Sequence, residues 1–336
     1  SVSPPTSQDA AWDKVVEAAK KEGKVTVYSF SFMGDMGQAL ARAFEERPGL
    51  NLEVVSGPGA FLLERIKVEA TARRHVADVL EGAATNGLLA KQASLTQSFD
   101  FLPALKETGV WLLDPRLDPD NHLVYANPSI NVPWANTRLV SSAEETRSWK
   151  DFLDPKWKGK ILALSPDTMP TPSLYYMLLT RYLGFDDEYF RSLGRQGLIM
   201  ATTQRESDSK LARGEAALAW SASLVSIGSM AAEGAPVKPL DMKEGVLGFA
   251  QTVNMIGGAP HPNASRVFMN WYLSAEGQTA AARIRNSLSL RTDVPDFTPP
   301  TARVKYTKVV PLTPKDIEDS ARVQRERVVS RIWGIQ

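Results

Sequence analysis

The sequence contains no cysteine, which excludes disulfide bonds, thiolate metal sites and cysteine nucleophiles. It also carries almost no net charge, because 39 lysine and arginine residues balance 38 aspartate and glutamate residues to leave +1. A chain without a strong field of one sign is a poor general binder of nucleic acid or of a membrane surface. Since no run of about 18 apolar residues occurs, we predict no membrane-spanning helix.

The composition is otherwise that of a folded chain. Hydrophobic residues make up 43% and charged residues 23%, which excludes a disordered or collagen-like protein. A length of 336 residues indicates two lobes, because domains average roughly 150 residues. The first seven residues lack the basic and apolar pattern of a signal peptide. We interpret them as a flexible tail or as the remnant of a removed export signal.

Motifs that usually mark an enzyme are missing. The run Gly57–Leu62 lacks the third glycine of a dinucleotide fingerprint, and no phosphate-binding loop, nucleophile elbow or HExxH helix occurs. Ser207–Lys210 fits S-x-x-K without its companion motifs, which favours an ordinary helix surface. The three histidines, His75, His122 and His261, show no metal-ligand spacing. We therefore expect a binding protein rather than an enzyme, with no cofactor and no metal.

The first third of the chain alternates between β-rich runs and amphipathic helical runs. Strands are predicted at residues 24–30, 51–56 and 76–80. Helices are predicted before the first strand and between the strands, around residues 12–19, 36–44 and 62–68. Because crossovers between parallel strands are right-handed, this order predicts a parallel sheet covered on both faces.

A second alternation follows an irregular stretch at residues 102–121. Strands are predicted at residues 160–165, 197–202 and 216–221, with helices at residues 174–183, 207–213 and from 223 onward. The run 247–258 is again strand-like, and helices follow around residues 268–273 and 277–284. The predicted fold class is α/β, with two doubly wound lobes.

Hydroxyl residues and glycines gather at the carboxyl ends of the predicted strands, where open α/β sheets bind their ligands. The candidate ligand-binding residues are Ser29, Phe30, Ser31, Ser56, Gly57, Gly59, Ala84, Thr85, Ser165, Thr168, Arg205, Trp220 and Ser221. Loops of this kind before helices leave backbone N–H groups free at the positive end of the helix dipole, which favours anionic ligand groups. Taken singly, most of the hydroxyl residues are equally well explained as helix N-caps.

Two larger side chains at these strand ends have two interpretations each. Arg205 can pair with a carboxylate or phosphate through two parallel hydrogen bonds, or it can be a solvated arginine. Trp220, together with Phe30, can form a flat apolar wall against a ligand, or it can belong to the core.

Several segments carry a family resemblance. They are residues 24–30, 40–57, 63–69, 77–79 and 152–161, the pair Gly214-Glu215 and the run 261–278 (HPNASRVFMNWYLSAEGQ). Together they resemble the iron-type family of extracellular solute-binding proteins of ABC importers, the class related to ferric-ion binding proteins. The resemblance implies a periplasmic binding protein of type II, in which two crossing strands join two lobes and hinge closure over a ligand is recognised by a membrane permease.

The same resemblance implies a lobe one of residues 1–126 plus 249–290 and a lobe two of residues 127–248 plus 291–336, with the ligand between them. It also implies a monomer without its signal peptide, located in the periplasm or tethered to the outer face of the cytoplasmic membrane. The expected partners are a small, anionic ligand and the permease subunits.

The iron ligands of that family are not found at the matching positions. The iron binders use a tyrosine pair soon after the Gly-Glu motif, because hard Fe³⁺ favours oxyanion ligands. Here no tyrosine follows Glu215 in that stretch, and Ala83 and Ala84 stand where a carboxylate is expected. Tyr175-Tyr176 is a tyrosine pair, but it precedes the motif and is expected to pack against a neighbouring element.

We therefore predict that the chain captures a small organic anion, a carboxylate, a phosphonate or a phosphorylated compound, for an ABC importer. Two alternatives stay open. One is a ferric-iron-binding protein of the same family that holds the metal with an exogenous anion. The other is an α/β enzyme that acts on an anionic substrate.

Overall fold

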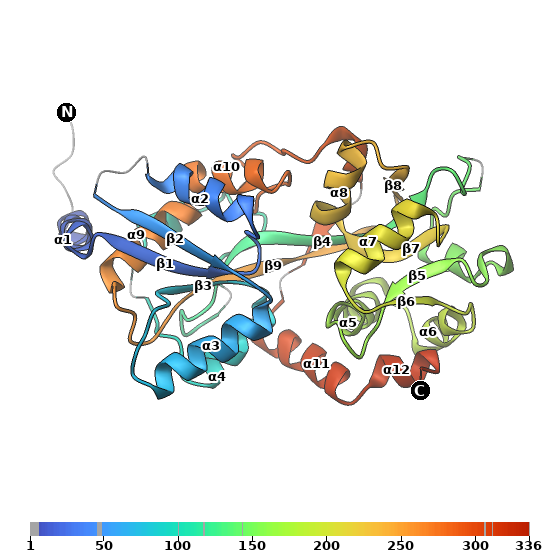
Figure 1. Cartoon of the computed structure of the whole chain (residues 1–336), viewed down its shortest axis with the longest axis horizontal. Helices are drawn as coiled ribbons and strands as arrows, with labels where there is room; N and C mark the ends of the chain where they lie inside the picture. Colours follow the sequence, from blue (N-terminus) through green and yellow to red (C-terminus); the bar gives the residue numbers. More distant parts are fainter. Residues whose placement is uncertain are drawn as a thin grey trace. The chain divides into compact units, whose positions relative to one another are not determined.

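The computed structural model describes residues 7–45, 49–99, 101–116, 118–142, 144–305, 307–310 and 312–335. Residues 1–6 of the predicted N-terminal tail lie outside this range. The chain forms two compact units: unit 1 is Ser1–Pro128 with Ala250–Asp296, and unit 2 is Ser129–Phe249 with Phe297–Gln336. Each unit is a sheet flanked by helices (Figure 1).

The sheet of unit 1 is parallel at its centre. Strand β1 (Lys24–Ser29) pairs in parallel with β2 (Asn51–Ser56) and with β3 (Val79–Gly82), as predicted. Strand β9 (Val246–Met255) runs antiparallel to β3, so the sheet is mixed. The strand predicted at 76–80 is shifted to Val79–Gly82, because it contains the buried carboxylate Glu81, which hydrophobicity does not reveal.

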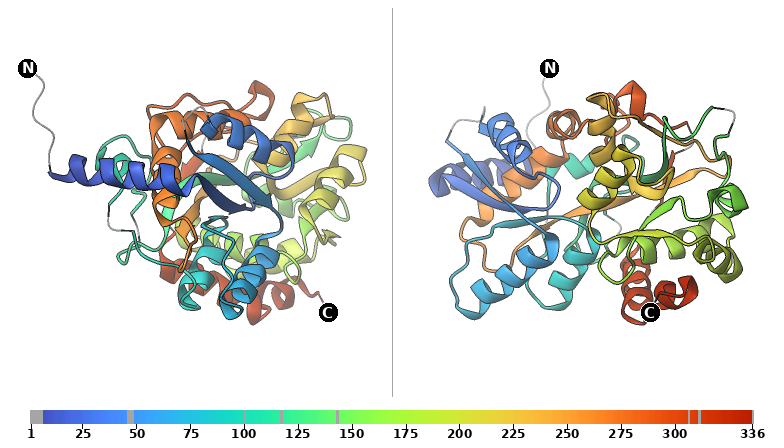
Figure 2. Two further views of the ribbon diagram at one scale, coloured as in Figure 1. Left: turned by 60° about the vertical axis from the view of Figure 1, so that its left-hand side comes forward. Right: turned by 45° about the vertical axis from the view of Figure 1, so that its right-hand side comes forward.

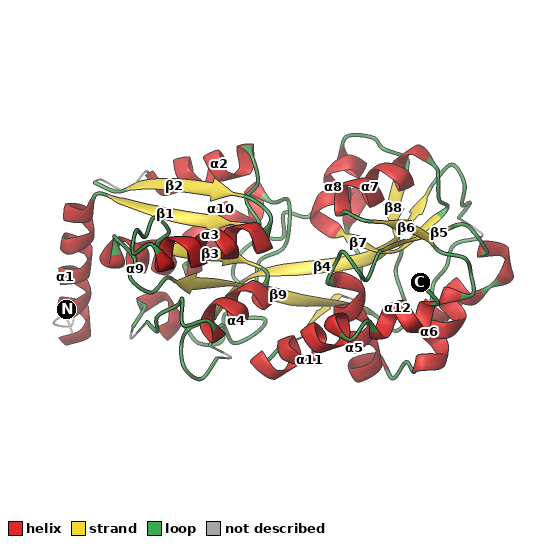
Figure 3. Cartoon of the chain, turned by 60° about the horizontal axis from the view of Figure 1, so that its bottom comes forward, coloured by secondary structure: helices red, strands yellow, loops and turns green. Residues whose placement is uncertain are grey.

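Helices cover both faces of this sheet (Figure 3). Alternate residues of β1 point to opposite faces: Val25 and Val27 join one buried cluster, and Tyr28 joins another. Residues of α1 (Ser7–Glu22), α2 (Asp35–Glu45), α9 (Pro262–Leu273) and α10 (Ala275–Ile284) complete the first cluster. Residues of α3 (Gly59–Thr71) and α4 (Ala84–Gln92) complete the second. The irregular stretch predicted at 102–121 contains only the short 3-10 helix η1 (Pro103–Lys106) among its described residues.

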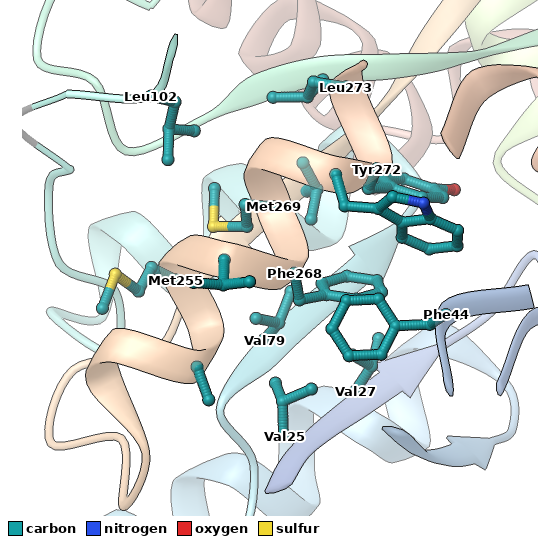
Figure 4. Close-up of a cluster of buried hydrophobic side chains, with 14 of the residues drawn as sticks. Val25, Val27, Phe44, Val79, Leu102, Met255, Phe268, Met269, Tyr272 and Leu273 are labelled. Atoms are coloured by element: carbon teal, nitrogen blue, oxygen red, sulfur yellow. The ribbon is translucent and has the colours of Figure 1, made fainter. Parts of the chain in front are cut away.

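An aromatic group forms the centre of the first cluster (Figure 4). The Phe268 ring stacks on the Tyr272 ring at a centroid distance of 5.4 Å and meets the Phe44 ring edge-on at 5.6 Å. Phe44 in turn lies 5.1 Å from Trp271. All four side chains are buried, so segment 261–278 fills the core of unit 1.

Three of the family-like segments, 24–30, 77–79 and 261–278, meet at a buried carboxylate. Asp78 is fully buried and accepts hydrogen bonds from the backbone N–H of Thr26 (2.7 Å) and of His261 (2.8 Å). Its Oδ2 also lies 2.9 Å from Nδ1 of His261. Asp78, which lies in a segment that carries the family resemblance, therefore links the start of α9 to strand β1 through hydrogen bonds.

Replacing Asp78 with asparagine is expected to destabilise unit 1 by about 1–2 kcal/mol, because the amide nitrogen would face a backbone N–H that has lost its acceptor. Urea denaturation of the whole chain at neutral pH measures the change. An unchanged midpoint would show that the local backbone relaxes to satisfy both donors.

Unit 2 has its own mixed sheet. Strands β5 (Ile161–Leu164), β6 (Ile199–Ala201) and β7 (Leu218–Ser223) are parallel, while β4 (Val124–Asn136) runs antiparallel to β7. The short β8 (Val237–Pro239) pairs with β4, and β10 (Thr307–Val309) pairs with β9. The sequence did not predict β4, because Pro128 and Pro133 interrupt its pattern; the register shifts between Val132 and Trp134, around Pro133.

Helices flank this second sheet on both faces as well (Figure 1). On one face lie α7 (Gln204–Arg213) and α8 (Leu224–Ala232), and on the other α5 (Thr171–Leu183) and α6 (Asp187–Gly194). The terminal helices α11 (Pro314–Arg325) and α12 (Val328–Trp333) pack against α5 and α6 (Figure 2). Short 3-10 helices complete the unit: η2 (Trp149–Leu153), η3 (Pro155–Trp157) and η4 (Pro300–Ala302). Among the described residues, no helix is long and apolar enough to cross a membrane.

Candidate ligand-binding site

The predicted site residues of unit 1 lie together at one edge of its sheet. Ser29 and Ser56 end neighbouring strands and are paired in register, and Ser29 is also paired with Glu81 near the end of β3. Phe30 and Ser31 follow β1, Gly57 and Gly59 lead into α3, and Ala84 and Thr85 open α4. These eight predicted residues therefore lie together, at the carboxyl ends of three neighbouring strands.

Helices α3 and α4 begin side by side. A Cβ atom added at Gly59 would lie only 1.8 Å from Nδ2 of Asn86, so the first turns of the two helices are in close contact. The residues before the helices are Pro58 and Ala83, and neither supplies a side-chain cap. Two positive helix ends with uncapped N–H groups therefore converge at this edge, an arrangement suited to an anion.

Two helices of unit 2, α7 and α8, begin differently, whereas α5 also starts without a side-chain cap. The Thr203 hydroxyl accepts a hydrogen bond from the backbone of Glu206, and the Ser223 hydroxyl accepts one from Ser226. These hydroxyl groups are ordinary N-caps, which is the simpler of the two interpretations of a serine or threonine at such a position. The uncapped helix starts are thus a particular property of α3 and α4 among these four helices.

Ser29 and Phe30 differ in how accessible their side chains are to a ligand. Ser29 is fully buried, donates to Glu81 Oε2 (2.7 Å) and accepts from the backbone of Phe32 (3.1 Å), so its hydroxyl is used inside unit 1. Phe30 is 43% exposed and, with Phe61 (62% exposed) of the first turn of α3, gives this edge apolar surface. Ser29 thus shapes the turn, while Phe30 remains accessible.

Sequence reasoning missed a buried polar cluster beneath this edge. Glu81 is 1% exposed and accepts hydrogen bonds from the backbone N–H of Ser31 (3.3 Å) and from Asn127 Nδ2 (3.1 Å), in addition to Ser29. Burial is the main cause that raises the pKa of the neighbouring Tyr272, and the Glu81 charge adds to it. The signal in the sequence is a lone carboxylate inside an apolar strand, directly before Gly82.

Three of the predicted residues of unit 2, Ser165, Thr168 and Arg205, lie in the segments that follow β5 and β6. Ser165 follows β5, and its backbone N–H donates to the carbonyl of Ala201 at the end of β6 (2.8 Å). The Thr168 hydroxyl donates to the carbonyl of Thr202 (3.0 Å). Arg205 lies exposed in the first turn of α7 and forms no ion pair within the described part of the chain.

Trp220 and Ser221 lie within β7 (Leu218–Ser223) and not at its end, because the strand continues beyond its predicted bound of residue 221. Ser221 is 4% exposed, and its hydroxyl finds no hydrogen-bond partner among the described residues. Trp220 is 1% exposed, and its Nε1 donates to the hydroxyl of Tyr189 (3.2 Å). The Trp220 ring belongs to the core of unit 2, which corrects the interpretation of this side chain as an exposed apolar wall.

Asp208 is a buried carboxylate between α7 and α8. It is 3% exposed and accepts hydrogen bonds from Gln204 Nε2 (2.6 Å) and from the hydroxyl of Ser226. Burial raises its pKa to about 6, and the two donors only partly oppose this effect. This acid joins the first turns of the two helices that follow β6 and β7.

Both hydroxyl groups of the tyrosine pair Tyr175-Tyr176 form hydrogen bonds within unit 2. Tyr175 is fully buried and donates to the carbonyl of Leu247 (2.6 Å), and Tyr176 donates to the Asp187 carboxylate (2.6 Å). Burial, followed by the Asp187 carboxylate, raises the pKa of Tyr176 to about 12. Both side chains pack as expected. Among the described residues, no three histidine, aspartate or glutamate side chains group as they would around a metal ion.

Comparisons with known proteins agree with this architecture. The family model described as bacterial extracellular solute-binding protein matches residues 39–308. A relative from Salmonella typhi, named "Putative 2-aminoethylphosphonate-binding periplasmic protein", is 25% identical over 288 residues, which cover 81% of this chain and 80% of the relative.

Solved structures show the same fold. The periplasmic binding protein AfuA from Actinobacillus pleuropneumoniae, with fructose 6-phosphate bound, matches at a TM-score of 0.71 and 20% identity over 92% of this chain and 97% of that one. Iron-bound HitA from Pseudomonas aeruginosa matches at 0.70 and 19% identity over 91% and 99%. The fold is therefore the periplasmic binding protein type II fold. The chain belongs to the family of bacterial extracellular solute-binding proteins and is the solute-binding component of an ABC importer.

Proposed function

We propose that the protein captures a small organic anion of the phosphonate or phosphate-ester class and delivers it to its permease without chemical change. The observation that carries the proposal is the contact between the uncapped starts of α3 and α4 beside Ser56. Backbone N–H groups at a helix start suit phosphonate and phosphate oxygens. The name of the Salmonella relative and the sugar phosphate in AfuA support the same class.

Each unit brings candidate contacts to this task. In unit 1 they are Phe30, Ser31, Ser56, Gly57, Gly59, Ala84 and Thr85, and in unit 2 they are Ser165, Thr168, Arg205 and Ser221. Among the described residues, the Ser221 hydroxyl has no hydrogen-bond partner and the Arg205 guanidinium has no ion-pair partner, so both groups can gain a hydrogen bond from a ligand. We further propose that the protein acts as a monomer in the periplasm or tethered to the outer face of the cytoplasmic membrane. Hinge closure stays a prediction from the family resemblance.

A thermal-shift panel tests the proposal. The panel contains 2-aminoethylphosphonate, ethylphosphonate, fructose 6-phosphate, citrate and Fe³⁺ with and without citrate. A ligand that binds the native state stabilises it by about 2.7 kcal/mol at a concentration of one hundred times Kd, which raises the melting temperature. A shift with Fe³⁺ alone would favour the iron-binding alternative, and turnover of a bound ligand on incubation would favour the enzyme alternative.

Replacing Arg205 with alanine is expected to weaken the binding of such an anion by about 1.5–3 kcal/mol, or roughly 10- to 100-fold in Kd, because a hydrogen bond to a charged group is lost. Isothermal titration calorimetry measures the change. Arg213→Ala is the matched control, since it removes the same charge from the exposed far end of the same helix. Equal affinities for the two variants would place Arg205 outside the site.

A further inference from the structure

The chain passes between the two units three times, and two of these passages are strands. Strand β4 crosses the boundary after Pro128, and β9 crosses it after Phe249. The third passage, after Asp296, lies in a segment without a helix or strand. Because β4 and β9 are neighbours in one sheet, any bending between the units has to deform this pair of strands.

On the unit 1 side of the boundary, Arg285 joins the two strands. Its Nη2 donates to the backbone carbonyl of Pro128 on β4 (3.2 Å) and to Oε1 of Gln251 on β9 (3.3 Å). Arg285 is 5% and Gln251 6% exposed, so water hardly competes for these hydrogen bonds. A guanidinium presents its donors in fixed directions, which suits it to hold two acceptors at once. Arg285, which ends α10, therefore cross-links β4 and β9 within unit 1.

On the unit 2 side, Tyr175 of α5 joins the same two strands. Its hydroxyl oxygen lies 2.6 Å from the carbonyl oxygen of Leu247 on β9 and 2.5 Å from that of Asn131 on β4, and it accepts from the backbone N–H of Asn131 (3.1 Å). The side chain is fully buried. Just beyond β10, the backbone N–H of Val310 also donates to the carbonyl of Gly248 (2.8 Å). The two strands are thus fastened to the body of unit 2 as far as residues 131 and 248.

Two residues of each strand lie between these cross-links. They are Ser129 and Ile130 on β4, and Phe249 and Ala250 on β9. Within the described part of the chain, no side chain of another residue is hydrogen-bonded to any of these four. The boundary between the units falls at Ser129 and between Phe249 and Ala250. The stretch without cross-links and the boundary of the units therefore coincide on both strands.

Gln251 also connects the unit 1 cross-link to the candidate site. The hydroxyl of Ser31, in the turn after β1, lies 2.8 Å from Oε1 of Gln251, the same oxygen that Arg285 contacts. Because a guanidinium only donates hydrogen bonds, this oxygen is the acceptor, and the Ser31 hydroxyl donates to it. A candidate ligand contact and the cross-link of the two strands therefore share one atom.

We propose that Arg285 and Tyr175 are positioning residues that confine the hinge to residues 129–130 of β4 and 249–250 of β9. This inference rests on the proposed function, because a hinge serves capture only if the units close over a ligand. A hinge is a short stretch that absorbs the change in backbone angles while the bodies on either side move rigidly. Confining it reduces the number of conformations of the unliganded protein, and so reduces the entropy that ligand binding has to remove.

The distance distribution between two spin labels tests this inference without a ligand. Because the chain has no cysteine, labels can be attached at Val68→Cys on α3 and Arg191→Cys on α6, two exposed positions outside the candidate contacts. Pulsed electron paramagnetic resonance then gives the distribution in the unliganded protein. Tyr175→Phe keeps the ring but removes the unit 2 cross-link, and Gln251→Met removes the acceptor of Arg285 on β9. Both substitutions are expected to widen the distribution.

Tyr176→Phe is the matched control, because it removes the neighbouring hydroxyl, which donates to Asp187 and not to a crossing strand. It is expected to leave the width unchanged. Calorimetry with 2-aminoethylphosphonate adds a readout of binding. The Kd is expected to be about 3- to 10-fold weaker for Tyr175→Phe than for Tyr176→Phe, the size of one lost hydrogen bond.

The outcomes separate the hinge from the proposed function. If no compound of the thermal-shift panel binds, the proposed function fails, while the widths in the unliganded protein still test the hinge. A width that is unchanged in both Tyr175→Phe and Gln251→Met overturns the inference, as does an equal widening in Tyr176→Phe. Widening in either cross-link variant, with the circular dichroism of a folded chain and no change in Tyr176→Phe, supports it. If one of the two variants does not fold, the other carries the test.

Discussion

Replacing Trp220 with alanine is expected to lower the free energy of unfolding of unit 2 by about 3–5 kcal/mol, the usual effect of emptying a buried aromatic site. The Trp220 ring lies in the middle of an aromatic group, with centroid distances of 5.6 Å to Trp333, 5.8 Å to Trp149 and 6.2 Å to Phe190. The substitution also leaves the buried Tyr189 hydroxyl without a donor. Guanidinium denaturation, combined with amide hydrogen exchange to assign the loss to unit 2, measures the effect.

Trp220→Phe is the matched variant, because it keeps an aromatic ring in the same site. It is expected to be less destabilising than Trp220→Ala. Ligand affinity, measured well below the melting temperature of each variant, then distinguishes the two interpretations of this side chain. A large loss of affinity with normal stability would restore Trp220 to the ligand surface.

Replacing Asp208 with asparagine is expected to stabilise the protein above pH 6 by up to about 3 kcal/mol relative to the wild type. The folded-state pKa of Asp208 is raised to about 6 from an ordinary value of 3.8, mainly by burial, so the folded state binds the proton more tightly than the unfolded state. Stability that depends on this proton is fully present below pH 3.8 and is lost as the pH rises through 6. Asparagine stays neutral and can still accept from Gln204 while it donates to Ser226.

Denaturation curves at pH 4.5 and pH 7.5 check this expectation. The advantage of Asp208→Asn should be larger at pH 7.5, and an equal difference at both values would contradict it. Ser226→Ala is expected to change the stability at high pH in the opposite direction to Asp208→Asn. The Ser226 hydroxyl stabilises the ionised carboxylate, so its removal should deepen the loss of stability as the pH rises.

The parts of the fold that were predictable are those in which a local pattern and its environment agree. Strand β2 was predicted with its observed bounds, because an apolar run there is closed by serine and glycine. Strand β4 was missed because prolines in a buried strand resemble a loop, and β3 was displaced because Glu81 is polar yet buried. A prediction from hydrophobicity places each residue in its usual environment, so it misses a polar side chain that is buried because hydrogen bonds satisfy it.

The candidate site also has features that a local sequence pattern predicts and features that depend on distant residues. Its strand-end residues were predictable, because the carboxyl ends of parallel strands share one edge whatever the details of packing. The hydrogen bond of Ser31 was not, since it depends on Gln251, which lies 220 positions away in the chain, and on Arg285 beyond it. Nor could the sequence decide whether Trp220 belongs to the core or contacts a ligand, because a tryptophan at the end of a predicted strand fits either role; β7 in fact continues to Ser223.

The division of the chain also determines the order in which the protein can be completed during synthesis. Unit 1 needs Ala250–Asp296, which brings Phe268, Trp271 and Tyr272 to its core. A growing chain that has reached Phe249 therefore holds three strands of unit 1 whose first face is covered only by α1 and α2, and the rest of this face is covered once α9 and α10 are made. Unit 1 can therefore complete its core only after residues 250–296 have been synthesised.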